Sequence, residues 1–200
     1  MKNTSLIYSA LLSSALLYSL AGCGTTPGQE WKPTAGVTTV VNSSYDLGFS
    51  EIGYGSGSIP VDYSSTNIEL GATLVSEGSD RPIKHQFAGI AFGSGELEDG
   101  FGGAIDGDEI SGGGRYYYDE GNAVIPFISI WSVLTDADGA TPQLGLRIGG
   151  GAEYPLNSNA ALTLSGDYLI PINDAQDEFF PGVTYDISGL SFRFGVRFMF

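Results

Sequence analysis

The last eleven residues, 190–200, alternate between apolar and mainly polar positions. Successive side chains of an extended strand point to opposite faces, so the alternation predicts a strand with one apolar face and one face that carries Arg193 and Arg197. The apolar face consists of Leu190, Phe192, Phe194, Val196, Phe198 and Phe200. Such a strand is typical of a transmembrane β-barrel, in which lipid contacts the apolar face and the lumen is polar.

Similar patterns recur along the chain. We expect strands near 38–52, 64–75, 83–94, 110–119, 123–134, 142–155, 159–172 and 187–200. The faces of 83–94 and 123–134 stay open, because Phe127 and Trp131 compete with Ile128 and Ile130 for the apolar side. After residue 22 no segment offers about 18 uncharged apolar residues, so only closed β-structure could cross a membrane. The pattern predicts an all-β fold: an eight-stranded antiparallel up-and-down transmembrane barrel over 38–200.

The expected connections alternate in length, as in barrels with short periplasmic turns and longer external loops. The connections at 119–122 and 156–159 are short, whereas 94–109 and 173–186 are long and acidic. The connection at 76–82 is longer than this rule predicts. The pattern therefore places the acidic connections outside the cell.

Charged residues on the inward face predict a closed lumen. Four arginines and three carboxylates are expected at inward positions of the strands: Arg115, Arg147, Arg193 and Arg197, and Glu69, Glu153 and Asp167. The interior of an eight-stranded barrel is just wide enough for side chains to fill it. We therefore expect an ion network that fills the lumen; an anion-selective pore would need a wider barrel.

The overall charge limits the partners. The chain has 8 Lys and Arg against 23 Asp and Glu, a formal net charge of −15. Such a chain repels the phosphates of nucleic acid, so nucleic acid is not an expected partner. The 30 glycines and 22 Tyr and Phe fit a barrel with aromatic belts.

The N-terminal segment predicts export. Lys2 precedes an uncharged, mainly apolar run at 6–21 that is too short to span a membrane and fits a secretory signal.

The run ends in Leu20-Ala21-Gly22-Cys23, which resembles the lipobox of bacterial lipoproteins, although a stray cysteine near an ordinary cleavage site would look the same. The resemblance implies that 1–22 is removed as a lipoprotein signal peptide, that Cys23 is lipidated with fatty acids such as palmitate, and that the protein is sorted to the outer membrane. Residues 23–37 have linker composition and are expected to tether the lipid to the barrel. Because Cys23 is the only cysteine, an intramolecular disulfide is excluded.

The final strand resembles the C-terminal strand of bacterial outer-membrane β-barrels. Arg193, Gly195, Phe198 and Phe200 match its pattern of a polar residue, a glycine, spaced apolar residues and a terminal aromatic. The resemblance implies that the barrel-assembly machinery recognises these residues. The general pattern of 38–200 is similar to the OmpX/Ail and OmpA transmembrane-domain class, whose members usually carry a plain signal peptide, so the lipobox is a departure from that class.

Catalytic groups are scarce. His85 is the only histidine, and the chain lacks both the His-x-Ser motif of PagL-type deacylases and the Asp-Ser pair of PagP-type palmitoyltransferases. The carboxylates at 96–109 do not have the spacing of an EF-hand. We therefore expect no enzyme activity, cofactor or metal site, and keep lipid A modification as an alternative.

The expected function is a structural, adhesion or envelope-interaction role through acidic external loops. Expected partners are outer-membrane lipid and lipopolysaccharide, the assembly machinery during biogenesis, and an external partner of unknown identity. A periplasmic lipocalin-like lipoprotein is a further alternative. It would need large apolar side chains inside, whereas the last strand places its arginines opposite the phenylalanines.

Overall fold

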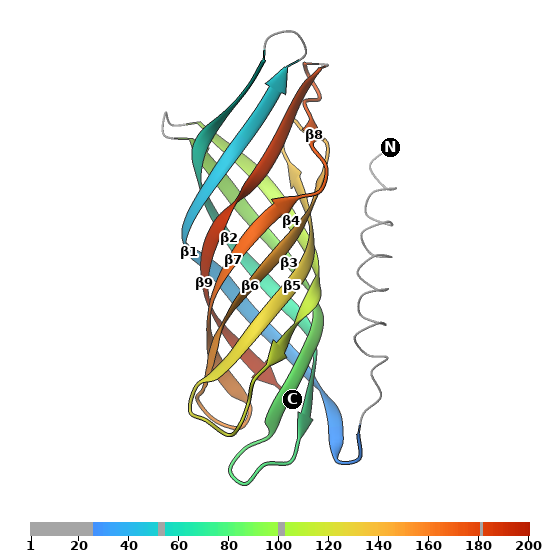
Figure 1. Cartoon of the computed structure of the whole chain (residues 1–200), viewed down its shortest axis with the longest axis vertical. Helices are drawn as coiled ribbons and strands as arrows, with labels where there is room; N and C mark the ends of the chain where they lie inside the picture. The colour runs from blue at the N-terminus through green and yellow to red at the C-terminus, as the bar shows by residue number, and fades with distance from the viewer. Residues whose placement is uncertain (1–25, 52–54, 100–102, 181) are drawn as a thin grey trace.

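The computed structural model describes residues 26–51, 55–99, 103–180 and 182–200. It consists of β1 (Gln29–Glu51), β2 (Gly55–Ser76), β3 (Ile83–Asp99), β4 (Ala104–Tyr117), β5 (Ile125–Ala137), β6 (Gln143–Pro155), β7 (Ala160–Pro171), β8 (Ala175–Gln176) and β9 (Val183–Met199). Eight long strands pair antiparallel with their neighbours in chain order, and β9 pairs with both β7 and β1, which closes the ring. The two-residue strand β8 pairs with the start of β9. The predicted eight-stranded antiparallel barrel is confirmed (Figure 1).

The barrel has two different ends (Figure 1). One end is here named the terminal end. β1 begins and β9 ends there, and this end also carries the β2–β3, β4–β5 and β6–β7 connections. At the other, the loop end, β1 and β3 end, β2 and β4 begin, and the short strand β8 lies. No helix among the described residues is long and apolar enough to cross a membrane.

The prediction of a long connection at 94–109 is wrong, because β3 and β4 continue as a paired hairpin through most of this segment. Ser94 pairs with Asp108, Glu96 with Asp106 and Glu98 with Ala104. Leu97, between two carboxylates, is buried inside the barrel. The alternation therefore persists here, but its polar positions are acidic, which made the segment look like a loop.

The boundary of the predicted linker at residue 37 also needs correction. β1 begins at Gln29, and Thr34 and Thr38 point into the barrel as buried side chains. Thr34 pairs with Gly71 of β2 and with Met199 of β9. Proline and glycine gave this segment linker composition, but its threonines are good strand formers.

The structure assigns the faces that the sequence left open. Phe127 and Trp131 fill the lumen, whereas Ile128 and Ile130 are exposed on the outer wall. Gly113 of β4 allows the backbone of β5 to approach closely: a Cβ on Gly113 would lie 2.7 Å from the Cα of Trp131. In β3, Phe87 points inward and Phe92 outward.

Candidate functional site

The lumen holds a network of charged side chains. All seven residues expected there lie inside the barrel and are buried, and the structure adds Lys84 and Glu109. Among the described residues the network thus has five cations, Lys84, Arg115, Arg147, Arg193 and Arg197, and four carboxylates, Glu69, Glu109, Glu153 and Asp167. Opposite charges are therefore nearly balanced in the interior.

One centre of the network is the pair formed by Glu109 of β4 and Arg147 of β6. The guanidinium donates to both carboxylate oxygens, with 2.8 Å between Nη1 and Oε1. The Tyr63 hydroxyl donates to Oε2 at 3.2 Å. Glu109 is only 3% exposed, so its assignment to an acidic external loop was wrong. Glu109 lies an even number of residues from Ser111 and Arg115 and therefore points to the same inward face. The strand expected from the sequence began at residue 110, so it did not include Glu109.

The second centre is Glu153, which is completely buried. Lys84 Nζ donates to it at 2.6 Å, Arg197 Nη1 at 2.7 Å and the Tyr117 hydroxyl at 2.8 Å. Lys84 lies beside a break in the β2–β3 register, because Val75 pairs with Lys84 but Leu74 pairs with Gln86. Its inward position therefore could not be counted from the alternation of its strand.

Further contacts extend each of the two centres within the lumen. Arg115 Nη2 donates to Glu69 at 2.6 Å, and Arg197 Nε lies 3.4 Å from the same carboxylate. Arg193 Nε lies 3.4 Å from Asp167 Oδ2. The Arg197 guanidinium also packs over the Phe87 ring at 3.9 Å, a favourable cation–π geometry.

Little space remains within the network. The cavity lined by Glu109, Arg115, Arg193 and their neighbours has a volume of about 20 Å³, enough for about one water molecule. The lumen is filled at this level, as the sequence predicted, and the described structure contains no open channel there.

The residues of the predicted assembly signal occupy two environments. Arg193 belongs to the lumen network, and a Cβ on Gly195 would lie 2.4 Å from the Val37 carbonyl oxygen. Phe198 and Phe200 instead expose their rings on the outside. The backbone N–H of Phe200 donates to the Pro33 carbonyl at 2.8 Å. Cys23, the predicted lipidation site, lies outside the described residues.

An ion pair outside the lumen network connects two turns at the terminal end. Arg81, between β2 and β3, donates to both oxygens of Asp119, between β4 and β5, at 2.6 and 2.7 Å. The backbone N–H groups of Lys84 and Gly121 donate to the same carboxylate at 2.9 and 3.0 Å. Partial burial raises the pKa of Asp119, but these hydrogen bonds outweigh burial and hold its pKa below the usual value.

The loop end is strongly acidic. Segments 45–62, 96–108, 135–142 and 172–187 contain no Lys, Arg or His. Their described carboxylates are Asp46, Glu51, Asp62, Glu96, Glu98, Asp106, Asp108, Asp136, Asp138, Asp174, Asp177, Glu178 and Asp186. Three cross-strand pairs oppose like charges: Asp62 with Glu98, Glu96 with Asp106, and Asp108 with Asp136. Within the described ranges no group of three or more His, Cys, Asp or Glu residues could hold a metal ion.

Asp177 orders part of this end. The Tyr185 hydroxyl donates to its carboxylate at 2.6 Å, and the backbone N–H groups of Phe179 and Phe180 donate at 2.7 and 2.8 Å. The hydroxyl and these N–H groups lower the pKa of Asp177, so the carboxylate is ionised at neutral pH.

His85 lies near the terminal end, where its Nε2 is 2.9 Å from the Ser76 hydroxyl. A catalytic triad needs a carboxylate on the other ring nitrogen. None of the described hydrogen bonds or ion pairs joins a carboxylate to His85. This pair therefore resembles a polar contact at a strand end more than a catalytic site.

No protein-family model and no curated protein matches this sequence. Among solved structures, the chain is similar to Neisserial surface protein A (NspA), with a TM-score of 0.53 and 16% identity over 86% of this chain and 99% of that chain. It also matches the N-terminal β-barrel domain of Pseudomonas aeruginosa OprF (TM-score 0.43, 15% identity, 86% of this chain and 100% of that chain). Ail of Yersinia pestis matches with a TM-score of 0.36 and 12% identity over 84% of this chain and 99% of that chain. The protein thus has the fold of the small eight-stranded outer-membrane β-barrels, and at these identities the likeness concerns the fold.

Proposed function

We propose that the protein is a bacterial outer-membrane β-barrel, lipid-anchored through Cys23, that has no enzyme activity and acts through its acidic loop end. The observation that carries the proposal is the inverted distribution of side chains. Arginines and carboxylates are buried, whereas isoleucine, leucine and phenylalanine are exposed on the wall. Exposure of so large an apolar surface is favourable in lipid and unfavourable in water.

The apolar wall is continuous across strands. In one cross-strand row, Ile130 of β5 pairs with Ile148 of β6, which pairs with Tyr168 of β7, which pairs with Leu190 of β9. All four side chains are exposed. This row supports a band that contacts the acyl chains of lipid and lipopolysaccharide.

The proposed orientation places the terminal end in the periplasm. A lipid on Cys23 would lie only six residues before β1, which begins at this end. Tyr118 and Tyr154 are exposed near the same end, as expected for residues at a membrane interface. The acidic loop end then faces outside and offers a surface to an external partner. The name of NspA, a surface protein, is in line with this orientation.

The two alternatives have less support. A lipid A-modifying enzyme would need reactive groups near the outer leaflet, whereas His85 lies toward the opposite end of β3. A lipocalin-like barrel would have a polar outer wall, whereas this wall carries the exposed apolar row.

Electrophoresis of outer-membrane fractions tests the membrane-spanning barrel. We expect the unheated protein to migrate differently from the heated one, and to stay with the membrane after alkaline extraction, because a closed barrel resists detergent until it is heated. Release by alkali without any heat-dependent shift would contradict the proposal.

The lipid anchor has a separate test. Cys23→Ser should abolish incorporation of labelled fatty acid while the heat-dependent shift persists. A free, unmodified N-terminus on the mature wild-type protein would remove the lipoprotein part of the proposal and leave the barrel part intact.

A further inference from the structure

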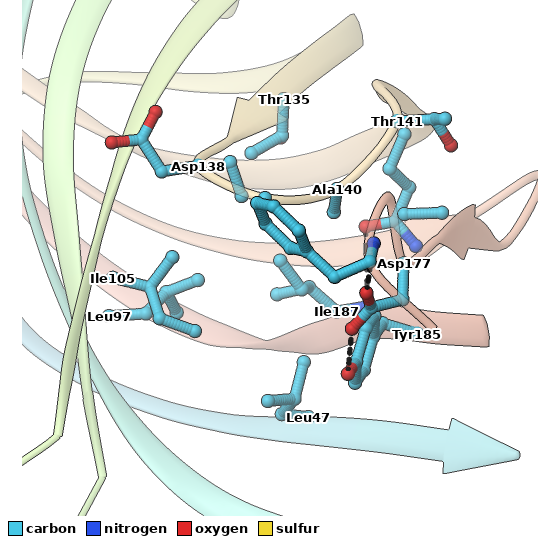
Figure 2. A pocket seen from close by; sticks show the side chains of 15 residues that line it. Leu47, Leu97, Ile105, Thr135, Asp138, Ala140, Thr141, Asp177, Tyr185 and Ile187 are labelled. Atoms are coloured by element: carbon cyan, nitrogen blue, oxygen red, sulfur yellow. Dashed lines mark hydrogen bonds between the residues drawn. The ribbon is translucent and has the colours of Figure 1, made fainter. Parts of the chain in front are cut away.

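The mouth of the barrel at the loop end contains an apolar pocket of about 210 Å³ (Figure 2). Leu47, Leu97, Ile105 and Ile187 come from four different strands, β1, β3, β4 and β9, and line a common space. Ala175 of β8 and Phe179 add to the apolar lining. The pocket lies beyond the ion network, because Gln143 in its lining is two inward positions nearer the loop end of β6 than Arg147. Its position therefore makes it accessible only from the loop end.

Gln143 supplies an unused hydrogen-bond donor in this pocket. The residue is only 4% exposed, and its Oε1 accepts from the backbone N–H of Ile187 at 3.2 Å. Its Nε2 has no hydrogen-bond partner within the described part of the chain. A buried donor without a partner is costly, so a ligand that brings an acceptor would gain binding energy from it.

The charge around the pocket favours one sign of ligand. Asp138 and Asp177 line the pocket, and residues 137–141 separate it from a wider hollow that carries Asp106, Asp108, Asp136 and Glu178. The segments of the loop end contain no basic residue to offset these charges. Their field attracts cations and repels anions.

We propose that this pocket binds a small organic cation that has an aromatic or aliphatic body and one hydrogen-bond acceptor. The body packs among Leu47, Leu97 and Ile187, the acceptor takes the hydrogen bond of Gln143 Nε2, and the positive group lies toward Asp138 and Asp177. The inference rests on the proposed function in that the loop end must face the outside to meet such a ligand.

Three benzamides of similar size test the proposal: cationic N-(2-aminoethyl)benzamide, neutral N-ethylbenzamide and anionic N-benzoylglycine. The refolded protein is titrated in nanodiscs of zwitterionic lipid, and the methyl resonances of Leu47, Leu97, Ile105 and Ile187 report binding. We expect the cation to shift these resonances and to bind about tenfold more tightly than the anion at low salt. The difference should shrink as salt screens the exposed charges.

Two variants locate the binding. Ala140→Trp should fill the pocket and weaken binding of the cation at least tenfold, whereas Ala104→Trp, at an exposed position of the same end outside the lining, should not. Gln143→Leu should weaken binding about fivefold, the effect of losing one hydrogen bond of about 1 kcal/mol. Heat-dependent mobility on a gel verifies that each variant is folded.

Several results would overturn the proposal: no shift of the pocket methyls at millimolar cation, tighter binding of N-benzoylglycine, or equal binding by Ala140→Trp and Ala104→Trp. None of these results would contradict the proposal of a membrane-spanning barrel, which is tested separately by the heat-dependent shift in electrophoretic mobility. Conversely, loss of that shift in the wild-type protein would refute the proposed function whatever the titration shows.

Discussion

At the scale of single residues, Glu109 shows how much one inward carboxylate contributes. Its side chain accepts both hydrogen bonds of the Arg147 fork and one from Tyr63, in an interior with room for about one water. Removal of one partner leaves the other as a buried charge without compensation, which costs more than the pair itself contributes.

We therefore predict that Glu109→Gln lowers the free energy of unfolding by about 3–5 kcal/mol. Urea unfolding in detergent micelles measures the loss. Asp108→Asn is the matched control, because Asp108 is the preceding residue on the same strand but is exposed, and it should change stability by less than about 0.5 kcal/mol.

A double variant separates the lost ion pair from lost packing. Glu109→Leu with Arg147→Met replaces both charges by apolar groups and should recover most of the stability, because neither partner is left unpaired. If Glu109→Gln were as stable as the wild type, Glu109 would not hold Arg147 in the way that the structure describes.

The residue scale also shows what the sequence could predict. Arg115, Arg147, Arg193 and Arg197 followed from strict alternation on strands whose phase was clear. Glu109 was missed because its neighbours are acidic, and Lys84 because the irregular register of β3 against β2 breaks the count. The alternation of apolar outward and polar inward positions can be predicted from one segment of sequence. Irregularities of register depend on pairing with another strand and are not visible in one segment.

At the scale of elements, strand existence was predictable and strand ends were not. All eight barrel strands were expected, but β1 begins nine residues earlier than residue 38, and β3 and β4 extend through the expected loop. Pairing decides these ends, since Thr34 gains partners on both β2 and β9 that its local composition does not reveal. The short strand β8 depends entirely on its pairing with β9.

The turns of the terminal end give a prediction of pH dependence. The folded pKa of Asp119 is lowered, so its contribution to stability is complete above the ordinary aspartate pKa of about 3.9 and is lost as pH falls through the lower folded value. Asp119→Asn should be less stable than the wild type by about 1–3 kcal/mol at pH 7. This difference should close in acid. Unfolding of both proteins from pH 7 to pH 2 measures it, and a constant difference over that range would contradict the assigned role of the carboxylate.

The last element gives a prediction about assembly. Phe200 is 70% exposed, so its ring adds little to the packing of the finished barrel. Phe200→Ala, which keeps the backbone hydrogen bond to Pro33, should leave the stability of protein refolded in detergent within about 0.5 kcal/mol of wild type, yet lower the amount of barrel that reaches the membrane in cells. The heat-shifted band measures that amount. Equal membrane levels of the two proteins would remove Phe200 from the predicted assembly signal.

At the scale of the whole molecule, the two ends of the barrel differ in charge. The basic residues of the described strands and turns lie at the terminal end or inside the lumen, and the described part of the loop end is anionic. The sequence predicted acidic connections at one end of the barrel and the filled lumen. The pocket at the mouth could not be predicted, because its lining comes from distant segments that meet only when the ring closes.

The central claim is that the apolar wall lies in the outer membrane with the loop end outside. Cysteines added one at a time at Asp138, Ile130 and Ser158 test it most directly, in variants expressed in Gram-negative cells and treated with a membrane-impermeant maleimide. The wild-type protein, which carries only Cys23, is the control. Asp138→Cys should react in intact cells, and Ser158→Cys only after the outer membrane is permeabilised. Ile130→Cys, at a wall position where the native side chain is 45% exposed, should react only after detergent removes the lipid. Reaction of Ile130→Cys in intact membranes as fast as Asp138→Cys, or labelling of Ser158→Cys but not of Asp138→Cys in intact cells, would contradict the account.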